Sequence, residues 1–205
     1  MKYDWKKSEK EFYMPKTTPE LRDIPPIIFF TLSGVGNPNE PDFANNIVAL
    51  YSLSYAVKMS PKKNLAPTNF YDFAVYPLEG VWTLADKNRE YSAANKNNFA
   101  YKIMIRQPDF VDKDFFLRMR EMTMRKKPDL PISRIKFEQI ADGKSVQILH
   151  VGSYDDESKS FAKMAEFLVA NNLSRKDLTH REIYLSDARK TTPEELKTVL
   201  RWSVK

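Results

Sequence analysis

The stretch Ile27-Ile28-Phe29-Phe30-Thr31-Leu32-Ser33-Gly34-Val35-Gly36 decides the fold, because the pattern that it opens returns in the second half of the chain. Residues 27–32 form a short, mostly apolar run that predicts a buried strand, and the glycines after it predict a turn. Pro41 and Asp42 then predict the first turn of a helix that runs to about residue 59. Proline is tolerated at that end of a helix, and acidic residues are favoured there.

The same arrangement recurs 118 residues later. Gly34 precedes Phe43-Ala44 by the spacing with which Gly152 precedes Phe161-Ala162. The helical stripes fall in the same register, formed by Phe43, Ile47 and Leu50 in one half and by Phe161, Ala165 and Leu168 in the other. Each helix is preceded by an apolar strand and followed by two more. The few identities leave chance open, but the shared order, spacing and stripe favour duplication. We therefore predict an α+β fold of tandem strand–helix–strand–strand modules with a pseudo-two-fold axis and a ligand groove at the seam.

The rest of the chain supplies the remaining predicted elements. They are strand signals over 71–84 broken at Pro77, a loop over 85–98, a strand over 99–106, a helix over 112–126, a hairpin of 134–140 and 145–151 turning at Asp142-Gly143, a helix over 156–172, a strand over 180–187, a short helix from Thr192 and a closing strand over 199–204. Residues 1–26 are charged and weakly periodic, which predicts an extended N-terminal arm. Residues 27–205 are predicted to form one domain, with modules of about 27–107 and 145–205 joined by a helix and a hairpin strand.

Composition limits the classes of function. The 205 residues are 42% hydrophobic, which suits a compact globular domain, and no apolar run is long enough to span a membrane. The polar start and the absence of cysteine fit a cytoplasmic protein without disulfides. Two histidines outside any metal-binding spacing predict neither a metal nor a cofactor. The net charge of +6 permits an anionic partner, yet acids interrupt the basic cluster at 118–127, which disfavours nucleic acid. No oligomeric state is predicted.

The strand His180-Arg181-Glu182-Ile183-Tyr184-Leu185-Ser186-Asp187 carries the candidate site. Its alternation places Ile183 and Leu185 on one face, with Glu182 and Tyr184 together on the other. If this face is open to solvent, the pair does not indicate a functional site. Facing a cleft, it would offer a carboxylate and an aromatic wall to a flat, cationic or electrophilic small molecule.

Five further residues are candidates for the wall of that cleft. Trp82 and Tyr76 share one parity, although Pro77 can break the register between them. Tyr55 lies one turn from Tyr51 on the first helix, off its apolar stripe. The other two candidates are Met104, which is flexible and polarizable, and Phe137 on the predicted hairpin. For all five the alternative is ordinary core packing or a place at the solvent rim.

Segments 77–82, 104–111 and 180–187, with the order of the elements, resemble the GyrI-like small-molecule-binding domains. More narrowly, the chain is similar to the stand-alone members that include cyclopropanoid cyclopropyl hydrolases, over about residues 3–205. The resemblance implies two modules that form a concave sheet surface, with helices on one side and the ligand groove on the concave side of the sheet. It also implies aromatic residues around the ligand and an acidic residue on a late strand facing it. Glu182 matches that acidic position.

Three functions remain open. One is a hydrolase in which Glu182, made more basic by partial desolvation, directs water onto a strained ring while Tyr184 binds a carbonyl oxygen. Another is a protein that sequesters aromatic xenobiotics without chemistry. The third is an interaction module that inhibits a larger enzyme, as the resemblance to the family's namesake implies.

Overall fold

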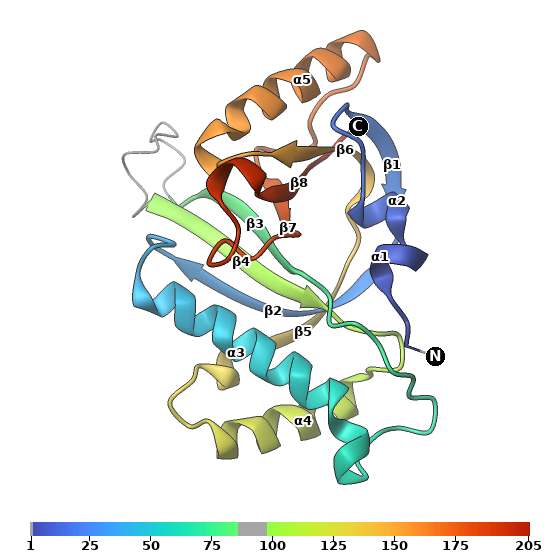
Figure 1. The fold of residues 1–205 in the computed structure, drawn as a ribbon, viewed down its shortest axis with the longest axis vertical. Helices are drawn as coiled ribbons and strands as arrows, with labels where there is room; N and C mark the ends of the chain where they lie inside the picture. The colour runs from blue at the N-terminus through green and yellow to red at the C-terminus, as the bar shows by residue number, and fades with distance from the viewer. Residues whose placement is uncertain (1, 86–97) are drawn as a thin grey trace.

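Residues 2–85 and 98–205 are described by a computed structural model, drawn in Figure 1. Within them, eight strands form one antiparallel sheet in the order β1-β6-β8-β7-β3-β4-β2-β5. The strands are β1 Glu20–Ile24, β2 Ile27–Val35, β3 Leu78–Leu84, β4 Phe99–Arg106, β5 Lys136–Ile140, β6 Gly143–Val151, β7 His180–Tyr184 and β8 Lys197–Ser203. The helices are α1 Trp5–Ser8, α2 Lys10–Tyr13, α3 Pro41–Lys58, α4 Lys113–Lys126 and α5 Glu157–Ala170, and short 3₁₀ turns are η1 Ser60–Lys63, η3 Ile132–Arg134, η4 Tyr154–Asp156 and η5 Pro193–Glu195.

The tandem α+β organisation is confirmed. The first module runs β2–α3–β3–β4 and the second β6–α5–β7–β8. In both modules the strand after the helix lies at the seam, the last strand lies in the middle, and the first strand lies outermost. The two modules meet where β3 pairs with β7, from Glu79 opposite Ile183 to Trp82 opposite His180.

The predicted hairpin of 134–140 with 145–151 is wrong. β5 pairs with β2, and β6 pairs with β1 and β8. Gly143 has φ +63°, so the Asp-Gly signal marks a real left-handed residue, but there the chain bends and continues instead of reversing. A turn signal is local, whereas pairing with β1 and β2 satisfies the backbone groups of both strands along their whole length.

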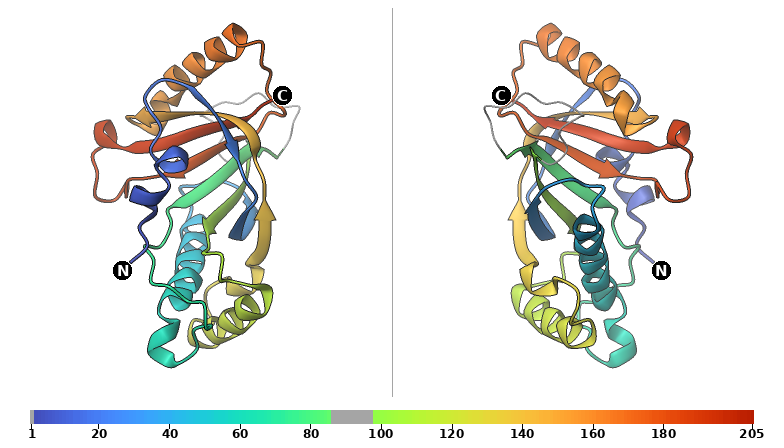
Figure 2. Two further views of the ribbon diagram at one scale, coloured as in Figure 1. Left: turned by 90° about the vertical axis from the view of Figure 1, so that its right-hand side faces the viewer. Right: turned by 90° about the vertical axis from the view of Figure 1, so that its left-hand side faces the viewer.

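β1 with β2, and β5 with β6, form two long bent strands that pair with each other. Ile27 lies seven positions after Glu20, and its partner Ile140 lies seven positions before Gln147, the partner of Glu20. The register therefore passes unchanged across the bend at 25–26 and 141–142. This two-stranded ribbon connects the two ends of the curled sheet, as the side views in Figure 2 show.

The sequence predicts an extended N-terminal arm, but the arm contains two short helices, α1 and α2. Asp4 accepts a hydrogen bond from the Lys6 amide and caps α1, and the side chains of Trp5 and Tyr13 are buried. β1 then occupies the edge beside β6. Weak periodicity hid these elements because each helix has a single turn, too short to show a 3.6-residue repeat.

The sheet has two faces, which we call the outer and inner face. The outer face is covered by α3, α4 and α5, with Leu50 and Leu53 of α3 against the first module and Met164 and Leu168 of α5 against the second. The inner face lies toward α1 and α2. There the Arg181 guanidinium of β7 lies 5.4 Å from the Phe29 ring of β2, although two strands stand between, so the sheet curls around this face.

Other boundaries follow the predictions closely for α3, α4, α5 and β4, whereas residues 71–77 precede β3 outside any strand. The loop expected at 85–98 lies almost entirely outside the described residues. No helix in the described part of the chain combines the length and apolar character needed to cross a membrane.

Candidate functional site

Glu182 lies on the outer face of β7, close to the seam between the modules. Its cross-strand neighbours are Gly80 of β3 and Leu200 of β8. Only 9% of the residue is exposed. The predicted alternation of the strand holds, because Ile183 belongs to the core on the opposite face. A carboxylate so little exposed to water needs partners, and its neighbours supply them.

Trp82 and Tyr184 join Glu182 on this face. The Trp82 indole Nε1–H donates a hydrogen bond of 2.8 Å to the Tyr184 hydroxyl. Gly80 makes this possible, since a Cβ at that position would lie 2.7 Å from the indole nitrogen. The Phe43 ring of α3 lies 5.7 Å from Trp82, and the Tyr154 ring of η4 meets Tyr184 edge-on at 6.0 Å. Aromatic side chains from both modules therefore surround the carboxylate.

His180 binds Glu182 directly. Its Nε2 lies 2.9 Å from Glu182 Oε1, and its ring packs edge-on against Phe161 of α5 at 5.2 Å. His180 and Glu182 are two residues apart on one strand, so they share a face. This contact fixes the orientation of the carboxylate.

Glu157, which sequence reasoning missed, is a second carboxyl group beside Glu182. It is the first residue of α5, it is 7% exposed, and its Oε1 has no hydrogen-bond partner within the described residues. Burial, together with the negative charges of Glu182 and Asp155, raises the pKa of Glu157 to about 9. At neutral pH Glu157 is therefore protonated. Acids are ordinary in a first helical turn, so its sequence context gave no signal.

The charge of Glu182 also acts on the two tyrosines. Burial, the charge of Glu182 and a hydrogen bond to it raise the pKa of Tyr184 well above its usual value. Burial and the same charge raise the pKa of Tyr154 to about 12. Thr198, opposite Tyr184 on β8, holds a buried hydroxyl without a partner in the described residues. The site thus combines two buried carboxyl groups, two tyrosines and two unpaired polar atoms that a ligand or water could satisfy.

The other candidate residues lie elsewhere. The Tyr76 hydroxyl donates a hydrogen bond of 2.8 Å to Glu9, and Met104 is buried on the inner face with its sulfur 3.0 Å from Arg181. Phe137 packs against Phe30 and Phe116. Tyr55 is 51% exposed and lies beside Tyr51. Tyr76 does not share a face with Trp82, because β3 begins only at Leu78 and the alternation of side chains does not extend back to Tyr76. The structure therefore brings together three of the seven predicted site residues, Glu182, Tyr184 and Trp82.

Residues 17–205 match the family model of the GyrI-like small molecule binding domain. An uncharacterized conserved protein from Listeria innocua is 35% identical, with a TM-score of 0.92 and complete coverage of both chains. A hydrolase from the same organism is 34% identical, with a TM-score of 0.90 and complete coverage of both chains. No match was found among the curated proteins.

The chain belongs to the GyrI-like small-molecule-binding family. The fold also resembles the EcmrR C-terminal domain, at a TM-score of 0.51 and 16% identity over 92% of this chain and 97% of that one. Membership of this family makes a small molecule the class of ligand. Within residues 2–85 and 98–205 no group of three or more His, Asp or Glu side chains is placed to hold a metal ion.

Glu157→Gln should make the protein more stable at alkaline pH. Between the usual carboxyl pKa and about 9 the folded state binds a proton that the unfolded state has lost, so the free energy of unfolding falls as pH rises through this range. The variant removes that penalty, which is on the order of 1–4 kcal/mol near pH 8. Urea unfolding at pH 5.5, 7 and 8.5 measures it. Glu166→Gln, at an exposed position of the same helix, is the control. Parallel pH profiles for wild type and Glu157→Gln would contradict the assignment.

Proposed function

We propose that this protein binds planar or cationic aromatic xenobiotics beside Glu182 and hydrolyses cyclopropanoid DNA-alkylating compounds by adding water. The observation that carries the proposal is the pair of buried carboxyl groups, Glu182 and Glu157, of which the second is held protonated. Aromatic side chains of both modules flank this pair. The hydrolase from Listeria innocua that shares 34% identity over the whole chain supports a hydrolytic reaction. We propose the cytoplasm as the place of action.

The reaction needs a base and a proton donor. Water oxygen bonds to a ring carbon of the cyclopropane, and the broken C–C bond's electron pair moves into a conjugated carbonyl group. Glu182 takes a proton from the attacking water, and the carbonyl oxygen gains a proton and becomes a hydroxyl group. The net change is addition of one water molecule, with no other reactant. A pair of neighbouring carboxyl groups, one of them with a raised pKa, is suited to these two roles.

Glu157 is better placed than Tyr184 to donate to the carbonyl oxygen. The Tyr184 hydroxyl already accepts from Trp82 and is hydrogen-bonded to Glu182. Glu157 is protonated at neutral pH and has a buried oxygen without a partner. We therefore assign Tyr184 to positioning Glu182 and Glu157 to proton donation. This changes the role that the sequence suggested for Tyr184.

Incubation of the purified protein with a cyclopropane-bearing DNA-alkylating compound tests the proposal. Mass spectrometry should show a water adduct in large molar excess over protein, and in H₂¹⁸O the product should gain the heavier oxygen. Heat-denatured protein gives the uncatalysed background. Product no faster than this background would overturn the hydrolase.

A non-catalytic sequestering protein is the second candidate. The observation that favours it is the contact of Glu182 with His180, because a carboxylate held in this way can also serve as a fixed counter-ion for a cationic aromatic ligand. Quenching of tryptophan fluorescence by the compound without any product would leave this function in place of the first.

A further inference from the structure

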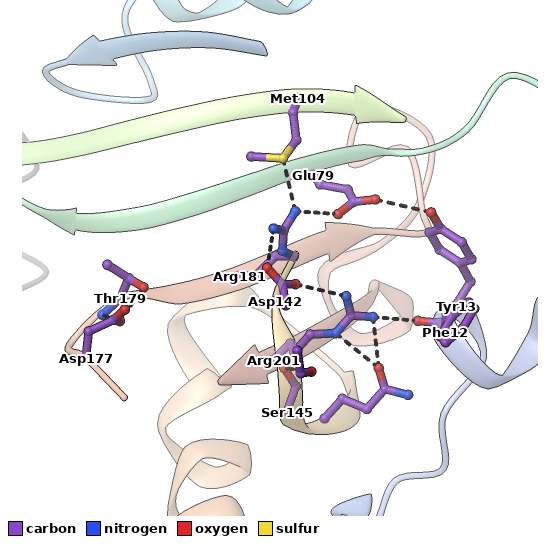
Figure 3. A network of polar contacts seen from close by, with 12 residues as sticks. Phe12, Tyr13, Glu79, Met104, Asp142, Ser145, Asp177, Thr179, Arg181 and Arg201 are labelled. Atoms are coloured by element: carbon purple, nitrogen blue, oxygen red, sulfur yellow. Dashed lines mark hydrogen bonds and ion pairs between the residues drawn. The ribbon is translucent and has the colours of Figure 1, made fainter. Parts of the chain in front are cut away.

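A separate cavity of about 290 Å³ opens on the inner face of the sheet. Residues of β3, β4, β7 and β8 line it, together with the bend between β5 and β6 and the segment that leads into β7. Arg181 points into this side of the sheet, whereas the adjacent Glu182 lies on the outer face. Figure 3 shows the polar network here, with Thr179 and Asp177 to the left of Arg181, and Asp142 and Arg201 below it. The cavity and the Glu182 site are thus on opposite faces.

The ionisable side chains at the cavity include cations that are paired with carboxylates beside the cavity, Lys102 with Glu138 and Arg181 with Glu79, as well as with Asp142 in its wall. The ionisable residues of the lining are Lys102, Lys176, His180, Arg181 and Arg201 together with Asp142 and Asp177. Both arginines are almost completely buried, with exposures of 5% and 4%. An unpaired donor on a buried cation in a partly enclosed space attracts an anion, because the surrounding low-dielectric walls weaken screening.

Most of the charged side chains at the cavity already form ion pairs within the protein. The groups without such a partner are therefore the ones that a ligand could contact. Asp142 accepts from Arg181 at 2.6 Å and from Arg201 at 3.3 Å, and Glu79 accepts from Arg181 at 2.9 Å, so the two arginines are paired with two carboxylates. Lys102 pairs with Glu138 at 3.1 Å. Lys176 forms no ion pair within the described residues, and Arg181 Nε is a buried donor without a hydrogen-bond partner there. These two groups are the donors that remain for an anion.

The remaining wall is apolar. Val81, Met104 and Ile140 lie side by side in the cluster that fills this part of the inner face, and all three line the cavity. A volume of about 290 Å³ is at the lower limit of small-molecule sites, which suits a compound with one ring. The wall would take the ring while the cations take the charged group.

We propose that this inner-face cavity binds a small organic acid, with a carboxylate or phosphate group toward Lys176 and Arg181 and a compact apolar body against Met104 and Val81. The proposal does not rest on the chemistry proposed at Glu182, although His180 both lines this cavity and contacts Glu182. Its ligand is anionic, whereas the outer site presents a carboxylate to its ligand.

Calorimetric titration with benzoate, phenyl phosphate and neutral benzyl alcohol tests the proposal. Benzoate or phenyl phosphate should bind, and the tighter of the two identifies the anionic group, while benzyl alcohol should bind at least about tenfold more weakly because it lacks the ion pair. Lys176→Gln should weaken binding about three- to tenfold. Ala141→Glu, which adds a carboxylate at an exposed position of the cavity wall, should weaken it by more than about tenfold.

Two controls separate this site from the rest of the molecule. Lys163→Gln removes an exposed lysine of α5 and should leave binding unchanged. Glu182→Gln should also leave it unchanged, whatever becomes of turnover. The proposal is overturned if neither anion binds, if benzyl alcohol binds as tightly, if binding survives both cavity variants, or if Glu182→Gln abolishes it.

Discussion

Glu182→Gln should lower the rate of cyclopropane hydrolysis by about 10²–10⁴-fold while the compound still binds. Glutamine keeps the size of the side chain and can still contact His180 and Tyr184, but it cannot accept a proton from water. The rate is measured by mass spectrometry of the water adduct, and binding by quenching of tryptophan fluorescence, since Trp82 lies beside the carboxylate.

Glu166→Gln is the matched control, because it makes the same chemical change at an exposed position of α5. It should leave both rate and binding at wild-type levels. Undiminished turnover in Glu182→Gln would remove this residue from the mechanism. A loss of binding that parallels the loss of rate would instead assign Glu182 to holding the ligand.

Arg181→Met should reduce the free energy of unfolding by about 3–5 kcal/mol. The guanidinium is buried and binds two buried carboxylates, Glu79 at 2.9 Å and Asp142 at 2.6 Å (Figure 3). Methionine has a similar length but no charge, so both buried carboxylates lose the positive charge that Arg181 supplies. Tyr13 still lies 3.4 Å from Glu79, and Arg201 still contacts Asp142. Urea denaturation at neutral pH gives the change in stability.

The control is Arg189→Met, which breaks the ion pair with Asp187 at 2.9 Å. That pair is exposed, so the expected loss is below about 1 kcal/mol. Adding Glu79→Gln to Arg181→Met should restore part of the stability, because it removes one of the unpaired buried charges. Equal losses for Arg181→Met and Arg189→Met would show that the inner network contributes no more than a surface pair.

The parts of the fold that the sequence predicts are those whose signals are local and periodic. The apolar runs and helical stripes around Phe43 and Phe161 predicted the two modules, and the structure confirms their order. The alternation at 180–187 placed Glu182 and Tyr184 on one face. Trp82 joins them because its strand is regular from Leu78 onward.

What the sequence could not predict depends on pairing between distant segments. The Asp142-Gly143 signal suggested a hairpin, but β5 pairs with β2 and β6 pairs with β1, each more than 100 residues earlier in the chain, and β6 also pairs with β8 near the C-terminus. Met104 lies on the inner face because of strand register, which its own alternating segment does not specify. Glu157 resembles any acid at a helix start, and only its burial beside Glu182 makes it unusual.

The unbroken register of the ribbon joins strands that are synthesised at very different times. β1 and β2 are among the first strands to be synthesised, yet Glu20 meets its partner Gln147 only after 127 further residues have been added. The apolar strand 27–32 likewise has no ribbon partner in the growing chain until residues 136–140 have been added. Pairs so distant in sequence form slowly, so we expect the closing of the ribbon to be the late, slow step of folding and the stage at which nascent chains aggregate most readily.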